Sequence, residues 1–302
     1  MQATVQATAR TKGPRVWLDM DQQELDDAYD QAVYAPNSAQ LAERRTVNSA
    51  AARGRVAHRR LAYGPTAVEM LDLYATAAPN APVMVLIHGG AWRAGSAADN
   101  AESAELFVHA GAHLAVLDFI TVIEAGGSLF PMIEQVRRAV AWVHRNARSF
   151  GGDPNRIYVA GRSSGAHLGG CVLITDWAAA FGLPADLVKG ALLASGMYDL
   201  KPVRLSKRGA YVKFTDAMED ELSAQRHLDR INCPVVLAHG TYETPEFQRQ
   251  TRDFAAALTA AGKPVTLIVA AGYNHFELPE TMANPYGLLG RAALALMGLA
   301  KA

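Results

Sequence analysis

Short apolar runs alternate with longer amphipathic runs from about residue 56 to the end of the chain. Apolar runs of roughly four to eight residues bounded by turn residues are typical of buried strands. Their alternation with helical patterns predicts an α/β fold, a mostly parallel sheet with helices on both faces. The eight expected strands are Arg59–Tyr63, Met70–Tyr74, Val83–Ile87, Leu114–Phe119, Ile157–Ala160, Gly190–Ala194, Val235–Ala238 and Val265–Val269.

Helical periodicity marks the segments between these strands. Apolar residues recur at helical spacing over 132–143, and Pro131 stands near the expected helix start. Residues 254–258 repeat the pattern after the seventh strand, and Leu288–Leu299 predicts a C-terminal helix rich in Ala and Leu. The open parallel sheet places ligand sites beyond the carboxyl ends of its strands.

The first 55 residues have a different character. Helical periodicity appears within residues 16–55, and no low-complexity linker separates this segment from the rest of the chain. A chain of 302 residues, half of them hydrophobic, is long enough to bury one large core. We therefore expect a single α/β domain over residues 1–302, with residues 1–55 as an N-terminal helical segment that covers the active site.

Charge and cysteine usage exclude several classes of protein. The chain has 29 basic and 29 acidic residues and no basic stripe, so nucleic acid is not an expected partner. No stretch approaches the roughly 18 apolar residues of a membrane span, and the start is polar, which favours a cytoplasmic protein without membrane contact. The two cysteines, Cys171 and Cys233, have no metal-binding spacing and are expected as buried hydrophobic residues rather than a disulfide.

A G-x-S-x-G pentapeptide, Gly161–Gly165, follows the expected strand at 157–160 and precedes a run, 166–174, that can continue as a helix. In a strand-turn-helix of this kind the central serine occupies a sharp turn, and the flanking glycines allow close approach of the strand and helix. The following helix N-terminus favours negative charge. The pattern nominates Ser163 as a nucleophile.

A second glycine motif, His88–Trp92, directly follows the strand at 83–87. Paired glycines leave backbone N–H groups unobstructed, and such donors stabilise a developing oxyanion. The motif by itself is equally compatible with a tight turn over a buried tryptophan. Together with the downstream pentapeptide it predicts an oxyanion hole formed by the N–H groups of Gly89, Gly90 and Ser164.

A serine needs a base, and nine histidines compete for that role. In this arrangement the chain order is serine, acid, histidine, with the base in the loop after the last strand. His275 is the histidine in that place, following the apolar run at 267–269.

The acid is expected after the preceding strand, where Glu243 and Glu246 stand on either side of Pro245. Pro245 predicts a helix start, so Glu246 fits a first helical turn on dipole grounds alone. Glu243 is the preferred partner of the histidine. Asp199, after the sixth strand, is the reserve, and Glu246 also stays open.

These residues together resemble the α/β-hydrolase fold, specifically the serine esterases and amidases with an H-G-G-x-W oxyanion loop. The resemblance is strongest to the kynurenine formamidase (arylformamidase) family and its bacterial relatives, and it runs from about residue 20 to the end of the chain. It is carried by His88–Trp92, Ser149–Pro154, Gly161–His167, Ser195–Leu200, Glu246–Gln250 and Asn274–Phe276.

The resemblance implies a catalytic triad of Ser163, Glu243 and His275, without a metal or organic cofactor. Two departures stand out. The acid is a glutamate where the animal formamidases lead us to expect aspartate, and Arg162 occupies the variable elbow position where histidine is common. Arg162 is compatible with two roles, favouring a carboxylate-bearing substrate or forming a structural salt bridge.

The expected activity is hydrolysis of a small acyl group from an aromatic amide, such as an aryl formamide, an acetamide or an N-acylanthranilate, through an acyl-enzyme on Ser163. The alternatives are a carboxylesterase for small or aromatic esters, a non-catalytic binding protein of the same fold, and lyase chemistry on the same scaffold. A homodimer is left open. Access is expected to involve the N-terminal segment and residues 120–130, and the expected pocket residues are Trp92, Arg162, Tyr29, Tyr34 and Phe276.

Overall fold

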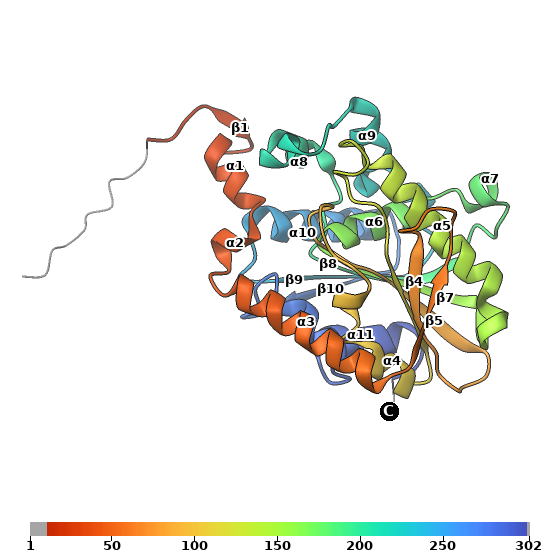
Figure 1. Cartoon of the computed structure of the whole chain (residues 1–302). Coiled ribbons are helices and arrows are strands. Elements are labelled where there is room, and N and C mark those ends of the chain that lie inside the picture. The colour runs from red at the N-terminus through yellow and green to blue at the C-terminus, as the bar shows by residue number, and fades with distance from the viewer. Residues whose placement is uncertain (1–10, 301–302) are drawn as a thin grey trace, which may run out of the picture.

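An eight-stranded sheet runs through the centre of the computed structural model, which describes residues 11–300 (Figure 1). Its strand order is β10-β9-β8-β7-β5-β6-β4-β3. The pairs from β10 to β6 are parallel, and β4 is antiparallel to both of its neighbours. The strands span His58–Ala62 (β3), Met70–Tyr74 (β4), Ala81–Ile87 (β5), His113–Leu117 (β6), Gly152–Arg162 (β7), Val188–Ala194 (β8), Val235–Gly240 (β9) and Val265–Ala270 (β10).

The sheet confirms the predicted α/β class and all eight expected strands. β7 is longer than its apolar run because it begins at Gly152, among polar residues, and continues to Arg162. A small hairpin of β1 (Arg15–Trp17) and β2 (Met20–Asp21) precedes the first helix and was not expected, since it is too short to show a strand pattern.

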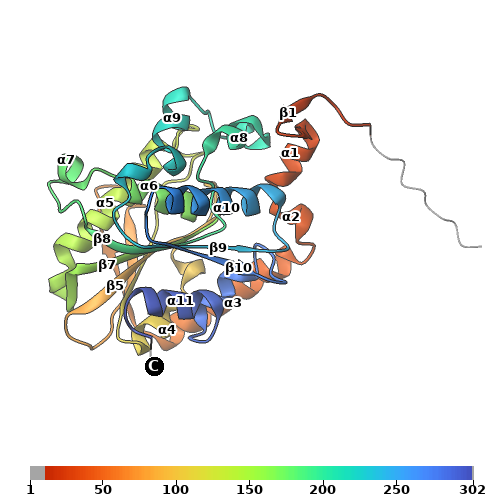
Figure 2. The same cartoon turned by 180° about the vertical axis from the view of Figure 1, so that it is seen from behind.

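Helices α5, α6 and α10 cover one face of the sheet, on the same side as the shorter helices α7, α8 and α9 (Figures 1 and 2). Ile157 and Val159 of β7 belong to the apolar cluster of this face, together with Phe254 of α10. The helices here span Phe130–Asn146 (α5), Ser164–Leu173 (α6), Trp177–Phe181 (α7), Leu200–Leu205 (α8), Asp216–Glu221 (α9) and Pro245–Ala260 (α10).

Helices α3 (Ser38–Arg55), α4 (Ala104–His109) and α11 (Leu288–Leu296) lie on the opposite face (Figures 1 and 2). Tyr158 and Ala160, the intervening residues of β7, belong to the apolar cluster of this side. Neighbouring strand residues therefore contact different helix layers, which is why the central strands are apolar throughout instead of alternating. Cys171 and Cys233 are free thiols in the buried core.

The N-terminal segment continues from the hairpin through α1 (Gln22–Ala28) and α2 (Gln31–Tyr34) into α3. Asp21 and Glu24 form a capping box at the start of α1. Tyr29, at the end of α1, donates a hydrogen bond to Glu246 of α10 (2.9 Å) and accepts one from Gln250 (2.7 Å). These buried contacts attach the segment to the end of α10 that lies next to the carboxyl ends of the strands (Figure 2).

Short 3₁₀ turns complete the chain at Ala98–Asn100, Ala147–Phe150, Lys207–Ala210, Ala224–Arg226, Leu228–Arg230 and Leu278–Ala283. Within residues 11–300, no helix combines the length and the apolar composition that crossing a membrane requires.

The junction of β7 and α6 is packed backbone to backbone. A methyl group on Gly161 would overlap the carbonyl of Gly165, and one on Gly165 would overlap the carbonyl oxygens of Ile87 and His88. Both positions therefore require glycine because the obstacle is main chain, which cannot rotate away.

We predict that Gly165→Ala lowers the free energy of unfolding by about 3 kcal/mol, the upper range for overpacking a close contact. Gly54→Ala, at an open and exposed helical position, serves as control and should raise stability by about 0.5 kcal/mol. Urea unfolding of the two variants measures both values. A Gly165→Ala variant as stable as the wild type would show that the turn at Ser163 can relax around a methyl group.

Candidate active site

Ser163 lies at the turn between β7 and α6 in a strained conformation, with φ of 54° and ψ of −126°. Positive φ is costly for a residue with a side chain, and here it is held by the packing of the flanking glycines. The Ser163 N–H donates to the carbonyl of Ala194 (2.9 Å), which ties the turn to β8. The serine therefore stands at the carboxyl end of the central strand, where it lines a cavity.

His275 follows β10 and lines the same cavity as Ser163. Its Nδ1 is 2.8 Å from Oε2 of Glu243. A carboxylate only accepts, so Nδ1 carries the proton and the neutral ring leaves Nε2 as an acceptor. Phe247 and Phe276 pack against the ring in T-shaped geometry, at centroid distances of 5.0 and 5.5 Å, and restrain its rotation.

Glu243 is buried in the turn after β9 and is held on both oxygens. Oε1 accepts hydrogen bonds from the Gly240 N–H and the Ser195 hydroxyl, both at 2.6 Å, while Oε2 faces His275. These hydrogen bonds fix the orientation of the carboxylate.

Ser195, directly after β8, is a site residue that sequence reasoning missed. It has a φ of 56°, and its N–H donates to the carbonyl of Ala238 in the neighbouring strand β9. This strained turn aims its hydroxyl at Glu243. In the sequence, the available signal was a small polar residue directly after an expected strand and before Gly196. That signal does not identify Glu243 as the partner, because the contact depends on β8 and β9 lying side by side in the sheet.

Glu246 does not contact His275. It pairs with Arg249 through both carboxylate oxygens (2.6 and 2.7 Å) and accepts from the Tyr29 hydroxyl. Burial, followed by the charge of Glu246, raises the pKa of Tyr29 well above its usual value. Glu246 is therefore part of the attachment of the N-terminal segment.

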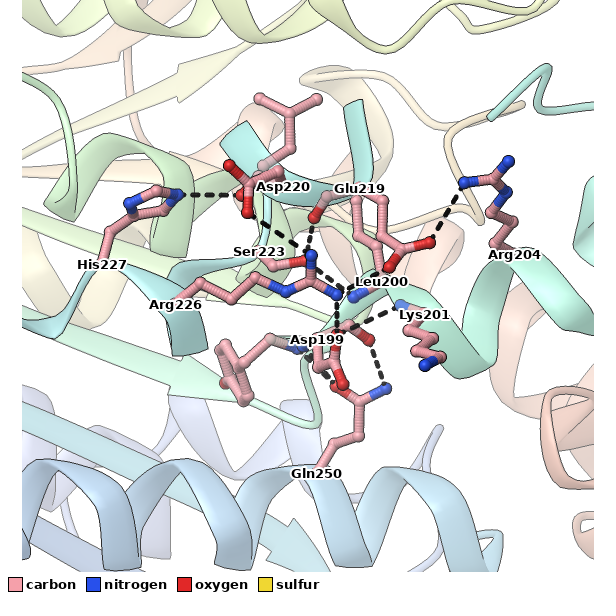
Figure 3. Close-up of polar contacts among 12 residues, drawn as sticks. Asp199, Leu200, Lys201, Arg204, Glu219, Asp220, Ser223, Arg226, His227 and Gln250 are labelled. Carbon is pink, nitrogen blue, oxygen red and sulfur yellow. Dashed lines mark hydrogen bonds and ion pairs between the residues drawn. The ribbon is translucent and has the colours of Figure 1, made fainter. Parts of the chain in front are cut away.

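Asp199, the other reserve acid, caps α8 and belongs to a network of polar contacts with Lys201, Arg226 and Gln250 (Figure 3). Its carboxylate accepts from the N–H of Lys201 (3.1 Å) and from Arg226 (3.2 Å). Gln250 of α10 bonds both its N–H and its carbonyl. Of the three carboxylates weighed from the sequence, Glu243 alone reaches His275.

The loop after β5 brings Gly89 and Gly90 beside the elbow. A methyl group on Gly89 would lie 2.9 Å from the Arg162 carbonyl oxygen and 3.1 Å from Cβ of Ser163, so the loop runs along the nucleophile. Gly90 has a φ of 127°. Within the described chain, the N–H groups of Gly89, Gly90 and Ser164 have no recorded acceptor, as an oxyanion hole requires.

A cavity of about 530 Å³ opens in front of Ser163, His275 and the glycine loop. Residues 29–32, 42, 43, 45 and 46 of the N-terminal segment form part of its wall. That this segment controls access stays a prediction. Residues 120–130 were expected to share this role, but none of them lines the cavity.

Tyr29, Arg162 and Phe276 line the cavity as expected, whereas Trp92 and Tyr34 do not. Tyr34 is 42 % exposed at the end of α2. Trp92 is buried, and both Ala91 and Trp92 adopt positive φ. Its indole packs against the ring of His167.

The Trp92 indole donates through Nε1 to Nδ1 of His167 (3.2 Å), and the opposite ring nitrogen of His167 lies 3.0 Å from the Leu222 carbonyl. The imidazole thus holds one donor and one acceptor, which only its neutral form satisfies. Burial lowers the pKa of His167 to about 4.

Arg162 lines the cavity immediately before Ser163. Its Nη2 donates to the Asn100 side-chain oxygen (2.8 Å), and no ion pair of Arg162 occurs in the described structure. Among the described residues Arg162 therefore bonds a neutral amide and forms no salt bridge. Burial, and then the charge of Arg45, lower the pKa of the Arg162 guanidinium to about 10.

Among residues 11–300, no group of three or more His, Cys, Asp or Glu side chains is arranged to hold a metal ion. The chemistry available at the cavity is that of a serine beside a histidine–carboxylate pair.

Comparison with known proteins agrees with this fold. The chain matches solved structures of a Pyrobaculum calidifontis esterase (TM-score 0.70, 19% identity, 93% of this chain and 98% of that one) and of the carboxylesterase EstE1 from a metagenomic library (TM-score 0.69, 19% identity, 89% and 98%). Both are esterases, and together with the sheet they define the fold as that of an α/β-hydrolase.

Sequence relatives are more specific. A family model described as BD-FAE matches residues 71–181. Kynurenine formamidase from Danio rerio is 30% identical over 243 residues, covering 78% of this chain and 80% of that protein. An isoprenylcysteine alpha-carbonyl methylesterase from Arabidopsis thaliana is 27% identical, covering 73% of this chain and 56% of that protein. The chain belongs to the α/β-hydrolase family of serine esterases and amidases that includes kynurenine formamidase, and is a hydrolase of the amide or ester type.

The neutral His167 predicts a pH-dependent stability. Its pKa is about 4 in the folded protein, against about 6.5 in an unfolded chain. Between these values the unfolded state binds a proton that the native state does not, so stability falls as pH drops from 6.5 toward 4.

We expect His167→Gln, which keeps a donor and an acceptor, to reduce the loss of unfolding free energy between pH 7 and 5 by about 1 to 2 kcal/mol. Urea unfolding at the two pH values measures the difference. His109→Gln, exposed at the end of α4, is the control. An unchanged pH dependence in His167→Gln would contradict a neutral buried imidazole.

Proposed function

We propose that this protein cleaves a small acyl group from an aromatic amide through an acyl-enzyme on Ser163. One observation carries the proposal: the strained Ser163 shares a cavity with His275, whose ring is oriented by the buried Glu243, beside three N–H groups without acceptors. A nucleophile, a base and oxyanion donors are the three parts that acyl transfer needs.

In the first half of the reaction, Nε2 of His275 takes the proton of the Ser163 hydroxyl as its oxygen attacks the acyl carbonyl. Glu243 stays ionised and stabilises the imidazolium, helped by the Ser195 and Gly240 donors that hold it in place. The carbonyl oxygen becomes an oxyanion facing Gly89, Gly90 and the first turn of α6. Each such donor is worth about 3 to 4 kcal/mol in the transition state.

In the second half, the imidazolium of His275 protonates the leaving nitrogen, and the amine departs. Water, deprotonated by the same Nε2, then attacks the ester carbon of the acyl-enzyme and releases Ser163 and a small carboxylic acid. One histidine nitrogen thus serves as base and acid in turn.

An aromatic amide is favoured as substrate by two observations. Kynurenine formamidase is a relative at 30% identity, and Tyr29, Tyr211 and Phe276 line the cavity and can pack against a ring. Chemistry adds a reason, since an arylamine nitrogen delocalises its charge into the ring and leaves more readily than an alkylamine.

A carboxylesterase acting on small or aromatic esters is the second candidate. It is supported by the methylesterase relative at 27% identity and by the esterases of similar fold. The same serine, histidine and oxyanion donors serve both reactions, so the leaving group decides between them.

Kinetics on three substrates test the proposal. We expect measurable kcat/KM on N-formylkynurenine and on an N-acetyl arylamine, together with turnover of short 4-nitrophenyl esters, and we expect Ser163→Ala to abolish all three. If the protein hydrolyses only the esters, the proposed amidase activity is wrong and the carboxylesterase activity takes its place. Hydrolysis that survives in Ser163→Ala would remove Ser163 as the nucleophile, and a wild-type protein inactive on the whole panel would favour a non-catalytic binding protein.

The assignment of the acid is tested by a matched pair of variants. We expect Glu243→Gln to lower kcat on 4-nitrophenyl acetate by roughly three to four orders of magnitude, as when the orienting acid of a triad becomes an amide. Glu246→Gln should retain most of kcat and lower the thermal unfolding midpoint, because it weakens the pair with Arg249 and the bond from Tyr29. The reverse order of the kcat losses would identify Glu246 as the acid.

A further inference from the structure

Positive charge is in excess around the cavity. Its lining includes five basic side chains against three acidic ones, and the acidic ones are largely engaged or exposed. Asp30 pairs with Lys207, Asp99 bonds Ser96, and Glu43 lies in the exposed part of α3. The basic residues are Arg45, Arg93, Arg162, Lys207 and Arg208.

Three of these cations have other roles. Lys207 is neutralised by Asp30. Arg208 donates to the Tyr211 hydroxyl and the Tyr29 carbonyl, and Arg93 lies over the Tyr211 ring at 4.3 Å. Arg45 and Arg162 remain. Like Arg93 and Arg208 they have no carboxylate partner among the described residues, but neither is held against a tyrosine ring, and the charge of Arg45 acts directly on Arg162.

Arg162 is placed beside the reacting atoms. Its Cγ would be 3.6 Å from a methyl group on Gly89, so the side chain leaves the backbone along the glycine loop. Its recorded partner is the amide oxygen of Asn100, a neutral group whose nitrogen is held by the Ser96 carbonyl (2.7 Å). Glu102 acts on Arg162 through its charge, but its recorded bond is from Ser49.

Arg45 differs from the other arginines of its helix. Along α3, Arg44 pairs with Glu280, Arg53 with Asp72 and Arg55 with Glu105. Arg45 has no recorded ion pair or hydrogen bond in the described chain, and its Nε is buried without a partner. Its charge also reaches Arg162, since it contributes to lowering the pKa of that group.

Two neighbouring guanidinium groups without counter-ions repel each other and are poorly solvated in a partly closed site. A bound carboxylate would offset both the repulsion between the two charges and their loss of solvation. It also matches the planar guanidinium, which can donate two parallel hydrogen bonds to it. The described residues place no carboxylate within ion-pair distance of either guanidinium, and Glu102 acts on Arg162 only from farther away, so a bound ligand can supply the anion.

We propose that Arg45 and Arg162 form a subsite for the carboxylate of the substrate, so that the preferred substrate is an aromatic amide carrying an acidic group close to its acylated nitrogen. Because Arg162 directly precedes Ser163, a carboxylate held there lies near the scissile carbonyl, which fits an ortho-substituted ring such as a 2-acylaminobenzoate. This inference rests on the proposed amide or ester hydrolysis at Ser163.

The experiment compares 2-formamidobenzoate with its neutral analogues 2-formamidobenzamide and formanilide. We expect wild-type kcat/KM to be highest for the acid. Arg45→Gln and Arg162→Gln should each lower the ratio of kcat/KM for acid over neutral substrate by roughly ten- to hundredfold, the loss expected for one charge-assisted contact. Arg162→Lys should restore part of that ratio, since it returns the charge without the fork.

Arg44→Gln is the matched control, because Arg44 neighbours Arg45 on α3 but pairs with Glu280 outside the cavity lining. Its acid-to-neutral ratio should equal that of the wild type. A ratio that falls equally in Arg44→Gln and Arg45→Gln would reduce the effect to general electrostatics and overturn the subsite. Unchanged ratios in Arg45→Gln and Arg162→Gln would also overturn it.

Binding separates this proposal from the proposed function. Calorimetry with Ser163→Ala protein measures the affinity for 2-formamidobenzoate and 2-formamidobenzamide without turnover. Tighter binding of the acid, lost when Arg45→Gln is added, supports the subsite even if the wild type hydrolyses esters alone. Equal affinity for the acid and the amide would refute the subsite even if both are hydrolysed.

Discussion

The close approach of β5, β7 and α6 around Ser163 is the constraint on which the site depends. Gly161 and Gly165 allow main chain to touch main chain there. Between them, Ser163 adopts a strained backbone conformation with positive φ. The same closeness brings the loop of Gly89 alongside the serine. Nucleophile and oxyanion donors are thus positioned by backbone packing, which does not need a substrate to assemble.

A second organising feature is the use of buried carboxylates for separate tasks. Glu243 accepts from Ser195 and Gly240 and thereby orients His275, whereas Glu246, three residues later, attaches the N-terminal segment through Tyr29. The two glutamates differ in role because one lies in the turn and the other in the first turn of α10. The segment held by Glu246 in turn forms part of the cavity wall.

The pattern of apolar and polar residues along the sequence was sufficient to predict most of the architecture. The central strands are apolar runs bounded by turn residues, so their positions and the parallel sheet follow from burial on both faces. Ser163, Gly89 and His275 could be nominated because chain order and strand ends fix where they meet. Among the expected pocket residues, the two that do not line the cavity are both aromatic, Trp92 and Tyr34. Trp92 was expected in the pocket, but it follows Ala91 in a loop where both residues have positive φ, and its indole bonds His167 instead. Positive φ at a non-glycine residue leaves no mark in the sequence.

The sequence by itself determined the order of elements, the elbow and the glycine loop, because these follow from periodicity and from glycine's freedom to approach other main chain. Tertiary structure decided which groups are paired. It showed that Glu243 rather than Glu246 or Asp199 reaches His275, that Ser195 supports it, and that Arg45 and Arg162 keep unpaired charges. Pairing joins residues far apart in the chain, and its energy depends on distance and burial, which only the folded arrangement defines.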